Sequence, residues 1–179
     1  VFKDDYWNVS VGTNTLSNVV NGAARTNTAI GHSALNSLTT GGANAAMGNE
    51  VLYSLTTGSN NTGLGREAGA QVVTGSNNVF LGYKAGYNET GSDKLYISSF
   101  KVSERDLITG DFSTGDLELG QTSGTVTVLN GLDVDGGTTI AGTTVLSDTL
   151  TVSGVTTLSD DLSVGGDATV TGASTLTGA

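Results

Sequence analysis

The chain has 179 residues, of which 27 are glycine and none is proline or cysteine, and its formal net charge is −10. With one histidine and no cysteine, the sequence offers no clear nucleophile beside a general base, so we expect no enzyme activity. We also expect no cofactor and no metal site. All seven basic residues lie at or before Arg105, so the rest of the chain is acidic, which argues against nucleic-acid binding. No apolar run is long enough for membrane insertion.

A 17-residue repeat occupies residues 1–98, the first predicted domain. Each copy has an asparagine, a short β-like segment, an aliphatic residue followed by glycine, and a Thr-Gly or Asn-Gly turn; an earlier copy fits with a two-residue insertion before Asn27. Such short fixed periods predict stacked coils, because one copy cannot bury its few apolar groups alone. We expect two buried columns, one of Ile30, Met47, Leu64 and Leu81, and one of Leu38, Leu55 and Val72.

The recurring asparagines Asn27, Asn44, Asn61 and Asn78 have two interpretations. They could form a hydrogen-bonded ladder between coils, as stacked amides do in cross-β structures. They could equally be turn-forming residues. The sequence leaves both open.

The position after the repeat glycine holds His32, Asn49, Arg66 and Tyr83 in successive copies. A position that accepts such different residue types is not constrained by packing, so we expect it to face solvent. Exposed aromatic residues can stack on sugars or anchor a protein partner. The candidate receptor-contact residues are therefore His32, Arg66, Tyr83 and Tyr53, with plain surface as the simpler interpretation of His32. Tyr87 has the same potential but could instead pack in the closing coil.

The segment Asn27-Thr28-Ala29-Ile30-Gly31 resembles the head repeats of YadA-like trimeric adhesins. The longer form with Thr-Thr-Gly turns resembles repeats in bacteriophage tail fibres and related bacterial fibre proteins. The resemblance implies a trimer of β-coils built for surface attachment, located on a virion tail or otherwise extracellular. It also implies two kinds of partner, a host cell-surface glycan or protein and other tail or fibre proteins.

Both repeat periods pause between residues 99 and 124, the second predicted domain. Residues 94–98 and 107–112 are predicted to be strands, and the second ends in a turn. This arrangement resembles the neck that follows such repeats in tail-fibre proteins. We interpret it as an adaptor and expect Phe100 and Phe112 to be core contacts.

A 6-residue repeat runs through residues 125–179, the third predicted domain. An aliphatic residue is followed two positions later by Gly, Asn or Asp, the residues that tolerate positive φ. A single-chain left-handed β-helix and an intertwined triple β-helix both fit, and we favour the intertwined form because it gives every strand two neighbours. The expected inward residues are Val134, Ile140, Leu146, Val152, Leu158, Val164, Val170 and Leu176.

The sequence therefore predicts an all-β homotrimeric fibre, with a stacked β-coil head-like region followed by an intertwined triple β-helix shaft. The favoured function is a structural and adhesive component of a phage tail fibre that attaches to a host surface. The alternatives are the head of a trimeric autotransporter-type bacterial adhesin and, less favoured, an ice-binding β-solenoid suggested by threonine pairs such as Thr138-Thr139.

Overall fold

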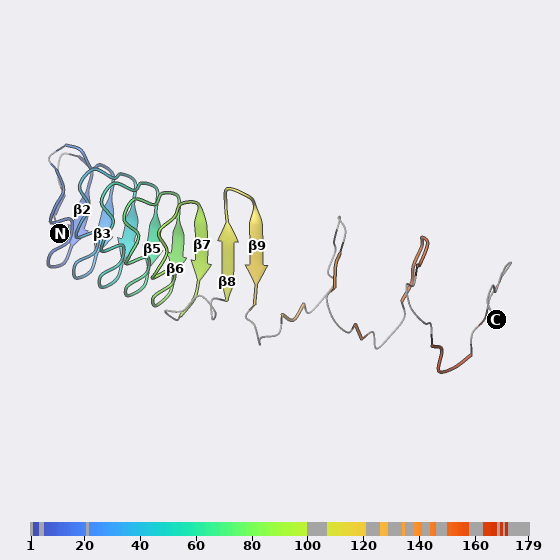
Figure 1. Cartoon of the computed structure of the whole chain (residues 1–179). Coiled ribbons are helices and arrows are strands. Elements are labelled where there is room, and N and C mark those ends of the chain that lie inside the picture. The colour runs from blue at the N-terminus through green and yellow to red at the C-terminus, as the bar shows by residue number, and fades with distance from the viewer. Residues whose placement is uncertain are drawn as a thin grey trace. The chain divides into compact units, whose positions relative to one another are not determined.

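The computed structural model describes residues 2–3, 6–20, 22–99 and 107–120, and short stretches between residues 126 and 171. The described residues form no helix, and their strands make one nine-stranded sheet in chain order, so the fold is all-β (Figure 1). The chain divides into two units, Val1–Gly131 and Leu132–Ala179, and the strands all belong to the first. They are β1 Phe2–Lys3, β2 Val9–Val11, β3 Thr28–Ile30, β4 Ala45–Met47, β5 Thr62–Leu64, β6 Val79–Leu81, β7 Lys94–Ile97, β8 Ile108–Asp111 and β9 Asp116–Leu119.

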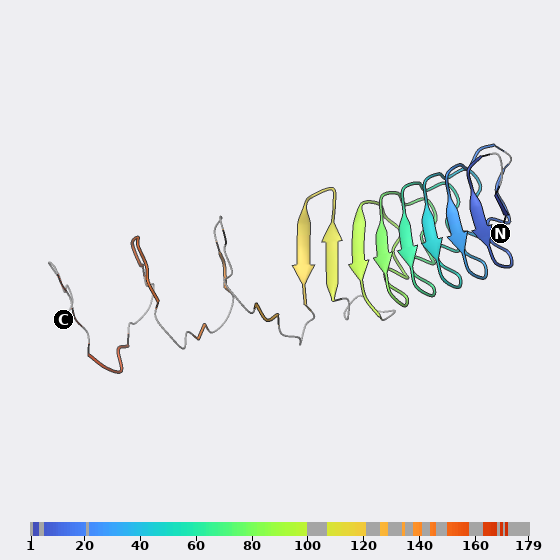
Figure 2. The same ribbon diagram turned by 180° about the vertical axis from the view of Figure 1, so that it is seen from behind.

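Strands β2 to β6 each pair in parallel with the next strand, and β2 to β7 build a β-solenoid of about five turns, seen from both sides in Figures 1 and 2. From β3 to β6 the register advances by the length of the repeat, since Thr28 pairs with Ala45 and Ala45 with Thr62. Val9 pairs with Thr28, so the first coil is longer and the predicted insertion before Asn27 is confirmed.

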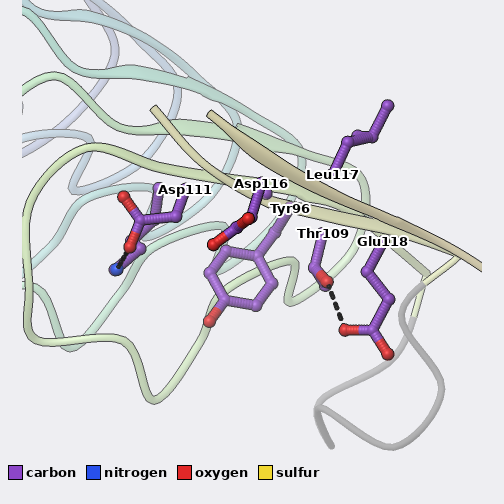
Figure 3. A pocket seen from close by; sticks show the side chains of 8 residues that line it. Tyr96, Thr109, Asp111, Asp116, Leu117 and Glu118 are labelled. Atoms are coloured by element: carbon purple, nitrogen blue, oxygen red, sulfur yellow. Dashed lines mark hydrogen bonds and ion pairs between the residues drawn. The ribbon is translucent and has the colours of Figure 1, made fainter. Parts of the chain in front are cut away.

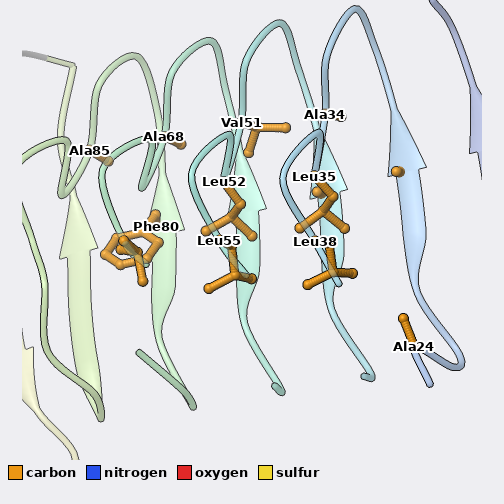
Figure 4. Packing of buried hydrophobic residues seen from close by; sticks show 13 residues of the cluster. Ala24, Ala34, Leu35, Leu38, Val51, Leu52, Leu55, Ala68, Phe80 and Ala85 are labelled. Atoms are coloured by element: carbon orange, nitrogen blue, oxygen red, sulfur yellow. The ribbon is translucent and has the colours of Figure 1, made fainter. Parts of the chain in front are cut away.

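Two walls fill the interior of the solenoid. The central residue of each three-residue strand points inward, which places Ala29, Ala46 and Phe80 in the core. The return segment of each coil supplies the larger aliphatic side chains from the other side (Figure 4). The predicted column of Leu38, Leu55 and Val72 is confirmed, because all three are fully buried.

The other predicted column is wrong, because its members lie on the outer face of the sheet. Met47 and Leu64 are each 49% exposed, and Ile30 and Leu81 are half-buried. Side chains alternate between the two faces of a strand, so only the central residue of a three-residue strand can point into the coil. The residue before each of these four points into the coil instead.

Phe80 occupies space that two glycines leave open. A Cβ atom on Gly69 would lie 2.6 Å from the Phe80 ring, and one on Gly86 would also collide with it. The Tyr96 ring stacks on the Phe80 ring with 5.9 Å between the centroids and 24° between the planes. One large side chain thus compensates for small neighbours in its own coil and in the coil before it.

We expect Phe80→Ala to lower the free energy of unfolding by about 3–5 kcal/mol, because it leaves a cavity that the glycine-lined walls cannot fill. Chemical denaturation at fixed protein concentration measures the loss. Tyr83→Ala, which removes an aromatic ring that is 42% exposed on the same coil, is the matched control and should cost far less. Equal losses would show that Phe80 does not support the core.

The recurring asparagines form the ladder, which decides between the two interpretations. The Nδ2 of each asparagine from Asn27 to Asn78 donates to the Oδ1 of the asparagine one coil earlier, at 3.0 Å, and to a glycine carbonyl at 2.9–3.0 Å. The same Oδ1 atoms accept the backbone N–H of the next asparagine at 2.9–3.0 Å. These side chains are at most 2% exposed, so the ladder satisfies a buried polar column completely.

The repeat glycine is required because adjacent coils approach closely at the corner. Gly48 has a φ of 144°, and a Cβ on it would lie 2.5 Å from the carbonyl oxygen of Gly65. L-residues with a side chain rarely adopt such a φ, and the carbonyl oxygen of Gly65 leaves no room for a Cβ atom at Gly48.

Parallel stacking stops at β7, where β7, β8 and β9 continue the sheet as antiparallel neighbours. The strands predicted at residues 94–98 and 107–112 are confirmed as β7 and β8. Phe112 is 53% exposed, so its predicted core contact is wrong; it lies in the turn after β8, outside the strand that packs. Phe100 lies outside the described residues.

In the unit Leu132–Ala179 the described residues form no strand. Four of the expected inward residues are described, and Val134, Ile140, Val152 and Val164 are 46–62% exposed in the single chain. The other four, Leu146, Leu158, Val170 and Leu176, lie outside the described residues. An intertwined helix needs further chains, so the 6-residue shaft and the three domain boundaries stay predictions.

Candidate functional site

The predicted receptor-contact residues all lie on the surface of the solenoid. His32, Arg66, Tyr53 and Tyr83 are exposed. The structure brings Arg66 and Tyr83 together, with the guanidinium carbon 5.1 Å from the ring centroid. His32 lies two coils before Arg66 and contacts Asn49 instead, through its Nδ1 atom at 3.3 Å. Tyr53 lies further along the coil of Asn49.

Glu67 and Lys84 join Arg66, Tyr83 and Tyr87 in what we call the aromatic–charged cluster. The Glu67 carboxylate lies 2.7 Å from the Arg66 guanidinium and 3.1 Å from the Lys84 ammonium. The Lys84 ammonium in turn lies 5.3 Å from the Tyr83 ring centroid and 5.2 Å from that of Tyr87. The sequence analysis did not single out Glu67 and Lys84, although they occupy equivalent positions in successive repeats and so were bound to be neighbours.

Electrostatics keep this cluster charged at neutral pH. Burial raises the pKa of Glu67, but the hydrogen bonds from Lys84 and Arg66 outweigh burial and lower it overall. The same hydrogen bonds raise the pKa of Arg66 and of Lys84. Two cations, one carboxylate and two rings leave a net positive, aromatic surface, which can contact sugar faces or acidic groups.

A hollow of about 290 Å³ lies on the inner side of β7, β8 and β9 (Figure 3). Two pairs of its polar residues contact each other: Lys94 forms an ion pair with Asp111, and the Thr109 hydroxyl donates to Glu118 at 3.2 Å. The Lys94 ammonium holds the pKa of Asp111 far below its ordinary value. These mutual contacts fit a structural network better than a ligand site.

Within the described ranges no three His, Cys, Asp or Glu side chains are grouped to hold a metal ion. The same ranges contain no helix that is long and apolar enough to cross a bilayer.

We expect acid to destabilise the first unit through Glu89. Burial raises the pKa of this carboxyl, but hydrogen bonds from the Gly91 N–H, the Tyr96 hydroxyl and the Thr90 N–H lower it overall. A lowered native-state pKa stabilises the fold above the ordinary value of 4.5, and this contribution is lost as the pH falls through the native-state pKa.

Thermal melts between pH 7 and pH 3 should therefore show a constant Tm down to about pH 5 and a fall below it. Glu89→Gln should flatten part of that fall. Tyr96→Phe should make the fall smaller, because removing one donor brings the native-state pKa of Glu89 closer to its ordinary value while the ring stack is kept. If the fall in Tm at acidic pH is unchanged in both variants, Glu89 is not its cause.

An uncharged face runs along the outside of the sheet, in two rows that we call the ridge row and the groove row. Strand register places one residue of each strand from β2 to β9 in each row. The ridge row is Val11, Ile30, Met47, Leu64, Leu81, Ile97, Ile108 and Leu119. The groove row is Val9, Thr28, Ala45, Thr62, Val79, Leu95, Gly110 and Leu117. Every ridge-row residue is aliphatic or methionine, and none of the sixteen positions is fully buried.

The two rows differ in height between β3 and β5. The groove row carries Thr28, Ala45 and Thr62 there, whereas the ridge row carries the longer Met47 and Leu64. These residues line a shallow hollow of about 190 Å³ that is open to solvent. Over β3 to β5 the face therefore has a ridge on one side and a groove on the other.

Comparison with known proteins finds no matching family model, no matching curated protein and no matching solved structure.

Proposed function

We propose that the chain is a structural and adhesive component of a homotrimeric fibre of the phage tail-fibre kind, located outside the cell and without a catalytic role. The observation that carries this proposal is the uncharged outer face, which exposes an aliphatic row along eight strands. Contiguous apolar surface of this kind is uncommon on a monomeric protein and marks an interaction site. Contact between copies of the chain would bury it.

The internal bonding of the solenoid supports a mechanical role. Each coil is joined to the next by parallel strand pairing, by the asparagine ladder and by close contact at the glycine corners. Each coil bonds to its neighbours in the same way, so the stack resists bending and stretching along its length. A fibre that holds a binding surface away from its base needs this property.

The aromatic–charged cluster, with His32 and Tyr53 on other coils, is the surface we assign to host contact. The Tyr83 ring offers a face for a sugar, and Arg66 and Lys84 add cationic donors beside it. The chemistry fits a host cell-surface glycan or an acidic protein segment. Arg66→Ala and Tyr83→Ala should each weaken retention of the full chain on a glycan array without changing its assembly.

The exposed aliphatic residues of the second unit support the intertwined shaft over the single-chain form. We favour the intertwined form because it gives every strand two neighbours. Val134, Ile140, Val152 and Val164 recur at multiples of six residues and are all exposed, as expected for side chains that only other chains can cover.

Light scattering on the full chain tests the assembly. We expect a mass three times that of the 17.9 kDa chain, unchanged on dilution, because intertwined chains do not separate without unfolding. A native mass equal to one chain would overturn the proposal.

A further inference from the structure

We propose that copies of this chain meet by a heterologous ridge-into-groove contact, in which the ridge row of one copy seats in the groove row of the next, with the solenoids parallel and in register. The proposal rests on the homotrimer proposed above and adds how the copies are joined. It is carried by the shape, the spacing, the charge and the extent of the outer face.

The shape of the face disfavours contact between identical rows. Met47 and Leu64 stand beside the groove lined by Thr28, Ala45 and Thr62. If the ridges of two copies faced each other, Met47 and Leu64 would collide and both grooves would stay empty. If the ridge of each copy seats in the groove of the next copy, every groove is filled. Such a contact joins two different patches, so the copies close into a ring when the rotation between them permits.

The spacing of the face selects a second copy as the occupant. Neighbouring ridge-row residues are one strand apart, about 4.8 Å, and the row continues across eight strands. A partner that covers the face must match that period over the whole row. Another copy in the same direction and register matches every step.

The charge of the face also fits self-association. The chain carries 17 acidic and 7 basic residues, yet neither row contains one. Residues 1–105 hold seven acidic and seven basic residues, and all of these charges lie outside the two rows. A contact made by the two rows therefore buries no charge between copies.

The antiparallel strands extend the contact beyond the solenoid. On β8 and β9 the inner face carries Thr109 paired with Glu118, and Asp111 paired with Asp116. The outer face of the same strands carries Ile108 paired with Leu119, and Leu117 is 61% exposed. The apolar side of this hairpin is therefore the side of the ridge row, where a neighbouring copy would lie.

Cysteine cross-linking tests the contact, because the chain has no cysteine of its own. Ala45→Cys lies in the groove row and Met47→Cys in the ridge row of the same strand. Two residues apart on a strand their Cβ atoms are about 7 Å apart, too far for a disulfide within one chain. We expect each single variant to stay uncross-linked, a co-refolded mixture of the two to give covalent dimers, and the double variant to give a covalent trimer on a non-reducing gel.

Val73→Cys, at a residue that is 46% exposed and outside both rows, replaces Ala45→Cys in the control mixture and should give no cross-link. A size exchange supplies a second measurement: Ala45→Phe should fill the groove and lower the Tm of the trimer, and Met47→Ala in the same chain should restore the Tm. A trimeric parent protein whose mixture gives no cross-link, or in which Met47→Cys alone cross-links fully, would overturn this contact and leave the trimer standing. A monomeric parent protein would instead overturn the trimer itself.

Discussion

Asn61→Leu is expected to lower the free energy of unfolding by about 3–6 kcal/mol, because it interrupts a buried ladder in the middle of the solenoid. The Oδ1 of Asn61 accepts the backbone N–H and the Nδ2 of Asn78, and its Nδ2 donates to the carbonyl of Gly75. A leucine leaves these three groups buried without those partners. Water cannot replace them in a column where the asparagines are at most 2% exposed.

Denaturant titration at one fixed protein concentration measures this loss, since the stability of an assembled protein depends on concentration. Asn49→Leu is the matched control: it makes the same exchange one coil earlier, at an exposed side chain whose contact is with His32. We expect it to cost less than about 1 kcal/mol. Similar losses in the two variants would show that the ladder contributes little.

The period of the repeat was enough to predict the stacking of the coils. Residues one repeat apart must occupy equivalent places, so Thr28, Ala45 and Thr62 fall in register, and the insertion before Asn27 lengthens one coil without disturbing the pairing. The ladder was one of two interpretations, because a single asparagine suits a turn as well as a column. The structure decides between the two interpretations, because asparagine side chains of successive coils lie within hydrogen-bond distance.

The direction of the side chains could not be predicted from the aliphatic character of Ile30, Met47, Leu64 and Leu81. Hydrophobicity alone assigns these residues to the core, but a strand of three residues offers one inward place, and Ala29 or Ala46 fits the narrow coil. The small inward residues were the available signal. Phe80 obscures it, since its ring fits inside only because Gly69 and Gly86 lie around it in space.

The composition of the candidate contact surface was predictable in part. The position after the repeat glycine indicated exposure for Arg66 and Tyr83, and the structure agrees. Their coupling through Glu67 and Lys84 depends on side chains from neighbouring coils reaching across the surface. Repeat spacing identifies such neighbours, but it does not show which side chains turn toward each other.

Met47→Asp combined with Leu64→Asp is expected to lower the Tm of the trimer, because it opens the contact between the solenoids while the intertwined shaft proposed for residues 125–179 keeps the three chains together. Both residues are 49% exposed on the outer face, so the coil itself tolerates the change and far-UV circular dichroism should be retained. In a trimer the substitutions would place unpaired carboxylates in an apolar contact, at a cost of several kcal/mol for each charge.

The control for this variant is Val73→Asp, which adds the same charge at an aliphatic residue that is 46% exposed and outside both rows. Its Tm should be close to that of the parent protein. If the double variant keeps the parent Tm, the outer face is not where the copies meet. If Val73→Asp lowers the Tm as much, added negative charge alone is sufficient, and the effect at Met47 and Leu64 no longer identifies the interface.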